Sequence, residues 1–173
     1  MRIGLVSDTH GRFDPGLRPL FEGCDLVLHA GDVVGREILA LLASVAPVTA
    51  VRGNNDLGDY GSGLPGEAVL QLEGLKTLVI HQLGRPQRPT PLARRAMERA
   101  RPDVVVFGHS HRPTIEVEDG ILFVNPGSAG PRRFRLPRTA AVMTVEGRKA
   151  RVEVFDLDRP ELPTFRMPFE VTL

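Results

Sequence analysis

The sequence has little of several things that would place it in a specialised class of proteins. Its single cysteine, Cys24, rules out a disulfide within the chain and is typical of a reducing compartment, so we expect a cytoplasmic protein. No apolar run approaches the roughly 20 residues of a membrane-spanning helix, and the N-terminus lacks the long apolar stretch of a signal peptide. The formal net charge is +1 at pH 7, so bulk charge predicts neither nucleic-acid nor membrane binding.

Internal repeats, low-complexity tracts and long linkers are missing as well. The 173 residues are the size of one ordinary domain. With 42% hydrophobic and 25% charged residues, the chain can bury a sizeable core, which argues against disorder. We therefore predict a single domain over residues 1–173.

The first half of the chain alternates short apolar runs with helix-like segments. The predicted strands are Arg2–Ser7, Asp25–Leu28 and Pro47–Val51, and the predicted helices are Asp14–Gly23 and Arg36–Ser44. The first helix has Asp14 as its N-cap, Pro15 at its first position and Gly23 at its end. This β-α-β-α-β order predicts a parallel sheet covered by helices.

The second half is richer in predicted strands. It begins with a Gly-rich loop, Gly58–Gly66, followed by a predicted hairpin of Ala68–Leu72 with Thr77–Ile80. A helix, Pro91–Ala100, and a buried strand, Val104–Phe107, come next. Four further strands are expected: Thr114–Val117, Ile121–Val124, Ala140–Val145 and Ala150–Phe155. Turns at Asp119-Gly120 and Glu146-Gly147 favour a β-meander over this part of the chain. The tail Leu157–Leu173 is either a closing edge strand or part of an oligomer contact. We predict an α/β fold, a four-layer α/β/β/α sandwich of two sheets flanked by helices.

Polar residues follow five of the predicted strands at the point where each strand ends. They are Asp8 and His10, then Asp32, then Asn54 and Asn55, then His81, and finally His109 and His111. In α/β sheets, ligands bind beyond the carboxyl ends of the parallel strands. The five segments are therefore expected to deliver carboxylate, imidazole and amide groups to one edge.

This mixture of side chains points to transition metals. Carboxylates, imidazoles and one amide suit Mn²⁺, Fe²⁺, Zn²⁺, Co²⁺ or Ni²⁺, whereas Ca²⁺ and Mg²⁺ prefer oxygen alone. The Asp8-x-His10 and His109-x-His111 pairs place alternate side chains on one side of an extended segment. Seven candidate ligands are too many for one ion and enough for two, which could clamp a phosphate for in-line displacement.

These motifs resemble those of the calcineurin-like metallophosphoesterases, in particular the small YfcE-type phosphodiesterases, over essentially the whole chain. The matching blocks occur in the family's order: Asp8-x-His10, Gly31-Asp32, Gly53-Asn54, His81, Gly108-His109-x-His111 and Asn125-Pro126-Gly127-Ser128. The resemblance implies that Asp8, His10 and His111 hold one metal, that Asn54, His81 and His109 hold a second, and that Asp32 bridges them. It also implies a hydroxide between the metals as nucleophile, with manganese favoured, and catalytic roles for Asp32, Asn54, Asn55 and His109.

The sequence departs from the family pattern at two positions. Many relatives have a histidine where this chain has Asn55, which can donate a hydrogen bond to phosphate but cannot act as a general acid near neutral pH. This favours esters with good leaving groups, or protonation of the leaving group by solvent or another residue. Relatives also commonly have glycine where Gln82 follows His81 in this chain.

Residues near the motifs are expected to support the site. We predict a structural or supporting role for His29 and a site-shaping tight turn at Asn125–Ser128. Four arginines follow that turn: Arg132, Arg133, Arg135 and Arg138. They could contact phosphate or substrate, but we favour the interpretation that they belong to a solvated loop. The segment Gly84–Pro91 is either a wall of the site or a plain connection.

The predicted function is a metal-dependent phosphodiesterase acting on a small phosphoester. A phosphomonoesterase would use the same ligands, so the ligand set does not separate the two reactions. A non-catalytic scaffold, as in the retromer subunit that shares this fold, is a third alternative, although all seven ligand positions are filled here. Formation of a dimer or tetramer stays open.

Overall fold

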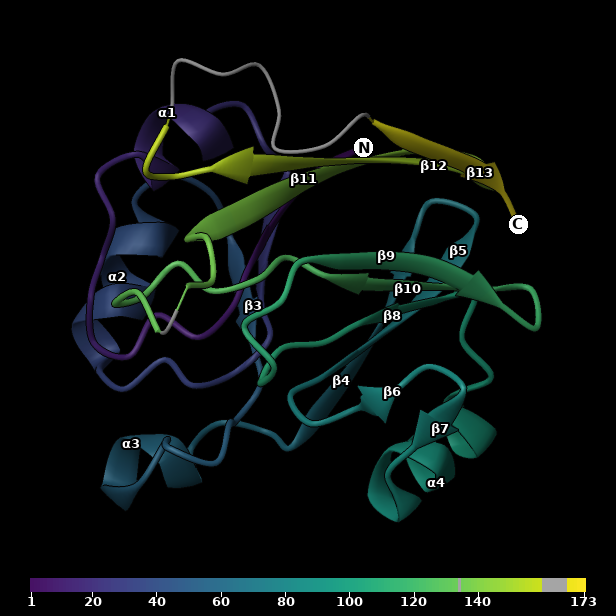
Figure 1. Cartoon of the computed structure of the whole chain (residues 1–173), viewed down its shortest axis with the longest axis horizontal. Coiled ribbons are helices and arrows are strands. Elements are labelled where there is room, and N and C mark those ends of the chain that lie inside the picture. Colours follow the sequence, from purple (N-terminus) through teal and green to yellow (C-terminus); the bar gives the residue numbers. More distant parts are fainter. Residues whose placement is uncertain (134, 160–167) are drawn as a thin grey trace.

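The computed structural model describes residues 1–133, 135–159 and 168–173 and contains two large β-sheets (Figure 1). One sheet contains β1 (Arg2–Val6), β2 (Leu26–His29), β3 (Val48–Ala50), β11 (Thr139–Glu146), β12 (Lys149–Asp156) and β13 (Phe169–Thr172). Its strand order is β13-β12-β11-β1-β2-β3. The other contains β4 (Glu67–Leu72), β5 (Leu75–Ile80), β8 (Val104–Val106), β9 (Thr114–Glu118) and β10 (Ile121–Asn125). Its order is β4-β5-β8-β10-β9.

Short helices and one small hairpin complete the described elements. The helices are α1 (Leu17–Phe21), α2 (Arg36–Ala43), α3 (Gly58–Ser62) and α4 (Pro91–Ala100), and the hairpin is β6 (Gly84–Arg85) with β7 (Arg88–Pro89). None of the helices in the described ranges has both the length and the apolar character to cross a membrane.

Each sheet contains three neighbouring parallel strands. In the six-stranded sheet β1, β2 and β3 run parallel up to the edge at β3, and the antiparallel strands lie on the β1 side. In the five-stranded sheet β5, β8 and β10 run parallel, with antiparallel β4 and β9 on either side. The prediction of a parallel sheet from the first half is confirmed. The predicted single meander is wrong, because β9 and β10 join one sheet while β11 and β12 join the other. Strand β10 pairs with β8, and the chain then crosses to the other sheet before β11.

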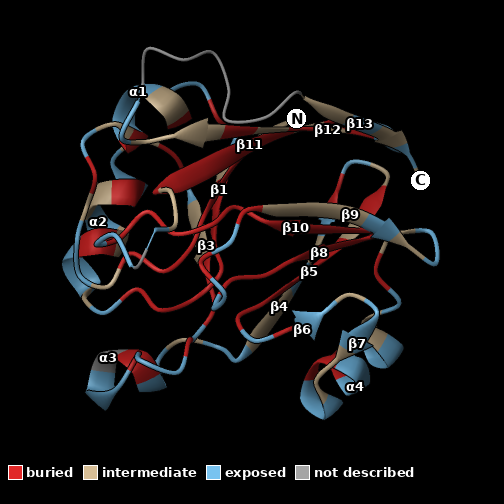
Figure 2. Ribbon diagram, viewed as in Figure 1, coloured by how far each residue is buried: buried red, intermediate tan, exposed pale blue. Residues whose placement is uncertain are grey.

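Three separate apolar clusters hold four layers together. The largest lies between the sheets, a second lies under α1 and α2, and a third lies under α4. Side chains along β8 point alternately to opposite faces of its sheet, so this strand contributes to two apolar clusters. Val104 and Val106 face the other sheet, while Val105 faces α4. The central strands are accordingly buried along most of their length (Figure 2). The predicted four-layer sandwich is confirmed.

The structure corrects the predicted start of the first helix. The helix begins at Leu17, and its N-cap is Gly16, which makes no side-chain capping bond. Asp14 lies two residues before that cap, where its carboxylate accepts from the backbone N–H of Gly16 and pairs with Arg138. Likewise, the predicted loop Gly58–Gly66 begins with α3.

The tail of the chain ends as a strand of the six-stranded sheet. Residues Phe169–Thr172 pair with β12 at the sheet edge, in agreement with the edge-strand alternative for this tail. Residues 160–167 of the predicted tail lie outside the described residues.

Candidate metal centre

All seven predicted ligands lie on loops at the carboxyl ends of parallel strands. Asp8 and His10 lie after β1, Asp32 after β2, Asn54 after β3, His81 after β5 and His111 after β8. His109, also after β8, packs its ring against His81, with the ring centroids 5.2 Å apart. Because β1 to β3 belong to one sheet and β5 and β8 to the other, the candidate site lies where the ends of both sheets meet.

The backbone of this edge is held in an uncommon conformation. Asp8, His10, Asp32, His109 and His111 all have φ between 47° and 69°. Side-chain-bearing residues rarely adopt this left-handed region, and each such residue costs about 1–3 kcal/mol unless its surroundings compensate. The concentration of this strain at the candidate ligands is typical of a functional site.

One group of ligand atoms surrounds the inner oxygen of Asp8. Oδ1 of Asp8 lies 3.1 Å from Nε2 of His111 and 3.9 Å from Nε2 of His10. The two Nε2 atoms are 3.4 Å apart. One ligand atom from each of these three residues falls within 4.8 Å of the others, which is a separation that one ion can span.

A second group shares Asp8 and adds Asp32 and His81. Oδ2 of Asp32 lies 3.5 Å from Nε2 of His81 and 3.8 Å from Nε2 of His10, so Asp32 stands between the two groups. The Nδ1 atom of His81 lies 2.7 Å from the carbonyl oxygen of Ala30, which can only accept. His81 therefore donates through Nδ1 and turns Nε2 into the site, as metal-bound histidines commonly do.

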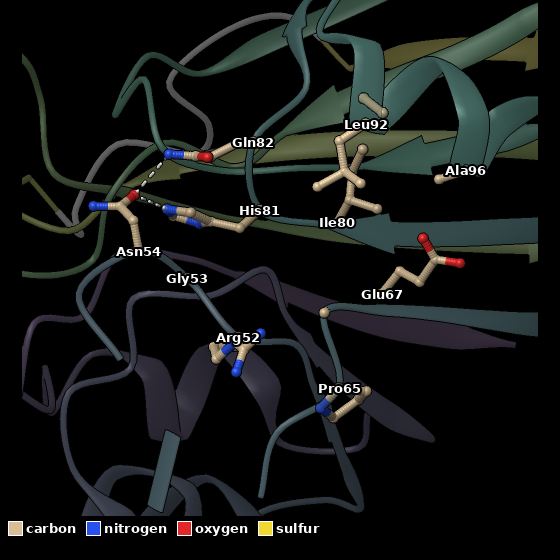
Figure 3. A pocket seen from close by; sticks show the side chains of 12 residues that line it. Arg52, Gly53, Asn54, Pro65, Glu67, Ile80, His81, Gln82, Leu92 and Ala96 are labelled. Carbon is tan, nitrogen blue, oxygen red and sulfur yellow. Dashed lines mark hydrogen bonds between the residues drawn. The ribbon is translucent and has the colours of Figure 1, made fainter. Parts of the chain in front are cut away.

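Asn54 completes this side of the centre (Figure 3). Its Oδ1 lies 3.1 Å from Nε2 of His81 and accepts from Nε2 of Gln82, also at 3.1 Å. Gln82, the departure from the family pattern, thus orients the amide of Asn54. His81 lies among the other candidate ligands despite that departure.

Asn55 makes a contact that the sequence did not reveal. Its backbone N–H donates to Oδ1 of Asp32 at 2.8 Å, and its side-chain Nδ2 donates to Oδ2 at 2.6 Å. We expected this amide to be available to a phosphate, whereas the structure uses it to hold the Asp32 carboxylate.

Asp56 is a supporting residue that sequence reasoning missed. Its carboxylate accepts the backbone N–H groups of Asp32, Val34 and Gly53 at 2.7 to 3.0 Å. It therefore ties the loop after β2 to the loop after β3. In the sequence Asp56 is only a third polar residue directly after Asn54 and Asn55. Ordinary turns also contain such runs of polar residues, so the sequence did not indicate its supporting role.

His29 and the turn Asn125–Ser128 form hydrogen bonds to the loops that carry candidate ligands. His29 is fully buried, and its Nε2 lies 3.0 Å from Oγ1 of Thr9, between Asp8 and His10. Asn125 donates to the carbonyl oxygen of Gly108, and Ser128 donates to that of Asp8. Both segments brace the loops that carry candidate ligands.

The arginine cluster divides into different roles. Arg138 is buried, 6% exposed, and binds Asp14 and Asp158, so the prediction of a solvated loop is wrong for it. Arg132 is exposed and pairs with Asp158. Arg133 donates from Nη2 to Nε2 of His10 at 3.2 Å, which places a guanidinium at the rim of the site.

The electrostatics of the site keep its carboxylates ionised. Burial raises the pKa of Asp32, but hydrogen bonds with His81 and Asn55 outweigh burial and hold the pKa far below the ordinary range for aspartate. For Asp8, burial is outweighed in the same way by its contact with His111, and the pKa is lowered. Ionised carboxylates and unprotonated imidazoles are the forms that bind metals.

The histidines divide between raised and lowered pKa. Burial lowers the pKa of His10 and of His109, and neighbouring cations, Arg133 and His81 respectively, lower it further. Burial also opposes the charged form of His81, but its hydrogen bond with Asp32 raises the pKa above the ordinary value.

The donor set fits divalent metal ions. Oδ1 of Asp8 is buried and accepts no hydrogen bond from the described part of the chain, although it faces two imidazoles. Gly53 and Gly108 allow the loops to close around the carboxylates. A Cβ at Gly53 would lie 2.2 Å from Oδ1 of Asp32, and one at Gly108 would lie 2.8 Å from Oδ2 of Asp8. A buried carboxylate oxygen that accepts no hydrogen bond and faces imidazole nitrogens is a place where a cation is stabilised.

Comparison with known proteins shows which family the chain belongs to. Residues 1–148 match the calcineurin-like phosphoesterase superfamily domain. The chain belongs to this superfamily. A probable metallophosphoesterase of Methanothermobacter thermautotrophicus is 31% identical over 92% of this chain and 95% of its own length. Phosphodiesterase MJ0936 of Methanocaldococcus jannaschii is 27% identical over 90% of this chain and its full length.

Solved structures of the superfamily fold also align with the chain. Vacuolar protein sorting 29 of Cryptosporidium parvum superposes with a TM-score of 0.81 at 22% identity, covering 99% of this chain and 98% of the other. The phosphoesterase YfcE of E. coli gives a TM-score of 0.69 at 23% identity, covering 99% of both chains. At this identity the likeness shows the calcineurin-like fold alone.

Proposed function

We propose that the chain is a phosphodiesterase that hydrolyses a small phosphoester with two divalent metal ions. The observation that carries the proposal is the pair of ligand groups that share Asp8, with Asp32 standing between His10 and His81. The relative named as a phosphodiesterase supports the choice of a diester.

The metals would be held as the family pattern implies. Asp8, His10 and His111 would hold one ion, Asn54, His81 and His109 would hold the other, and Asp32 would be a ligand shared between them. Manganese is our first choice, with zinc, iron, nickel and cobalt compatible with the same donors. When bound, the ions supply a water of lowered pKa as nucleophile and neutralise charge on the phosphate.

The chain's own residues set the limits of the reaction. Asn55 holds the Asp32 carboxylate and cannot donate a proton to a departing alkoxide. Arg133 donates to the nitrogen that His10 would present to a metal, so its guanidinium is free to turn to a phosphate oxygen once His10 is a ligand. Without a neighbouring acid, esters of acidic alcohols are the preferred substrates.

The test is manganese-dependent hydrolysis of bis(p-nitrophenyl) phosphate by the parent protein and two variants. We expect Asp32→Ala and His109→Ala each to lower kcat/KM by at least about a hundredfold, since each removes a candidate ligand. Circular dichroism checks that the fold is retained, and Leu57→Ser is a control at an exposed side chain outside the described ligand groups. Parent-like hydrolysis by both variants would show that these residues are misassigned.

Two alternatives are separated by cheap measurements. A phosphomonoesterase would hydrolyse p-nitrophenyl phosphate faster than the diester under the same conditions. A scaffold is suggested by the structural likeness to vacuolar protein sorting 29. Protein that binds no metal and gains no activity on metal addition would support the scaffold.

A further inference from the structure

A cavity opens beside the candidate metal centre, on the side of Asn54 and His81. Its volume is about 490 Å³, and both of these residues form part of its lining. The other walls come from the start of β4, the end of β5 and the first turns of α4. The cavity is therefore continuous with the place where a phosphate would bind, and its size lies within the usual range of about 300–1,000 Å³ for small-molecule sites.

Most of the wall away from the metal centre is apolar. Leu92, Ala93 and Ala96 of α4 line one side together with Ile80 at the end of β5, and Pro65 lines another. Figure 3 shows the side chains of Leu92 and Ile80 together, with Pro65 across the space from them. Leu92 is 75% exposed although it is a large apolar side chain. A single exposed leucine needs no explanation, but a leucine at the mouth of an apolar cavity is typical of a ligand-binding wall.

The charged groups in the cavity do not favour a second phosphate. Glu67 is an acid, and its Oε1 lies 2.7 Å from Nη2 of Arg99, so this charge is already paired. Arg52 contributes one guanidinium, which can stack on the face of an aromatic ring. A phosphate placed here would lie mostly against apolar side chains, with Arg52 as the one guanidinium among the described lining residues, whereas an uncharged ring would lose little hydration and can stack on Arg52.

We propose that this cavity holds an uncharged aryl or heteroaryl group of the phosphoester. The phosphate of the same molecule would lie at the metal centre, so the inference rests on the proposed function and names its substrate class: diesters that carry an aromatic alcohol. The α4 wall selects the ring, and the metal centre carries out the chemistry.

Binding of two phosphonates that differ only in one group tests the proposal. Methyl phenylphosphonate and methyl methylphosphonate share the anionic centre, and the phosphorus–carbon bond keeps the phenyl or methyl group attached. Calorimetry on the manganese-supplemented protein should give a Kd about tenfold or more lower for the phenyl compound, since burial of the ring removes apolar surface from water.

Two variants change the cavity in opposite ways. Leu92→Ser removes an apolar wall, and Gly66→Leu fills space, because a Cβ at Gly66 would meet no atom within 4 Å. Both should reduce the preference for phenyl to about threefold or less. Leu57→Ser is the matched control, since Leu57 is also 75% exposed but does not line the cavity. Circular dichroism verifies folding of each variant.

The outcomes separate this inference from the proposed function. An unchanged phenyl preference in both cavity variants, or its absence in the parent protein, overturns the inference, even if bis(p-nitrophenyl) phosphate is hydrolysed. A phenyl preference that falls in both variants but not in Leu57→Ser supports the cavity as the ring site. If that pattern appears while no metal restores hydrolysis, the ring site stands and the proposed function fails.

Discussion

At the scale of single residues, the candidate site depends on side chains that hold its candidate ligands and their loops in place. Asn55 holds both oxygens of Asp32, and Asp56 gathers three backbone N–H groups from two loops. His29 is the clearest example of an ionisable group kept neutral. Thr9 donates its hydroxyl hydrogen to Val33, so the hydrogen between His29 and Thr9 belongs to Nε2 of His29. Its Nδ1 has no hydrogen-bond partner among the described residues.

This arrangement predicts a pH-dependent contribution of His29 to stability. Burial lowers the pKa of His29 to about 4, below its unfolded value of about 6.5. The folded state therefore binds the proton less well than the unfolded state. The contribution is fully present above pH 6.5 and declines as the pH falls towards 4, by up to about 3 kcal/mol for one proton.

Replacement of His29 by glutamine should remove this dependence. Glutamine keeps a side-chain N–H for Thr9 but does not titrate, so stability of His29→Gln should fall less than that of the parent between pH 7 and pH 5. Urea unfolding at both pH values in the presence of a chelator measures the difference. Equal losses in the two proteins would contradict the neutral, buried assignment of His29.

At the scale of elements, the loops are joined by a buried ion pair between distant parts of the chain. Arg138, just before β11, binds Asp14 of the loop before α1 and Asp158 of the segment after β12. It also donates to the carbonyl oxygens of Ala129 and Gly130, beside Ser128, which binds Asp8. This cluster holds the turn after β10 against the first motif loop.

Loss of Arg138 should be costly. Arg138→Met leaves the buried Asp14 carboxylate without its guanidinium, and we expect a loss of about 3–5 kcal/mol in the free energy of unfolding. Arg132→Met is the matched control, because Arg132 is an exposed arginine that also binds Asp158, and such pairs contribute about 1 kcal/mol or less. Denaturant unfolding compares the two. A similar loss in both variants would mean that Arg138 acts only as a surface charge.

At the scale of the whole molecule, the candidate centre connects two sheets. Asp8, His10, Asp32 and Asn54 follow strands of one sheet, whereas His81, His109 and His111 follow strands of the other. A ligand that binds the folded protein at this junction should stabilise it as one unit.

Metal addition should therefore raise the thermal stability. At a manganese concentration about a hundred times the Kd, one bound ion stabilises the folded state by about 2.7 kcal/mol, which calorimetry would record as a rise in Tm of several degrees. Removal of the metal with a chelator should reverse the shift. Asp8→Asn, which alters the residue common to both ligand groups, should show a much smaller rise, and an equal rise would place the bound metal elsewhere.

The sequence by itself predicted the residues that the fold brings together as candidate ligands. Buried apolar strands that end in aspartate, histidine or asparagine have few structural explanations, so Asp8, Asp32 and His109 stood out without coordinates. The helix Pro91–Ala100 was also predicted from the sequence with its observed bounds. Its local signals agree with this, since Thr90 caps the helix and Pro91 fits its first turn. The α/β class followed from the order of strands and helices.

Only the tertiary structure decided how these pieces meet. Local patterns do not say which sheet a strand joins, so β9 to β12 looked like one meander although strand pairing divides them between two sheets. They do not show that Asn55 donates to Asp32, or that Arg138 is buried against Asp14, because these partners are distant in sequence. The cavity beside His81 was equally invisible, since its walls come from β4, β5 and α4, and only folding places them around one space.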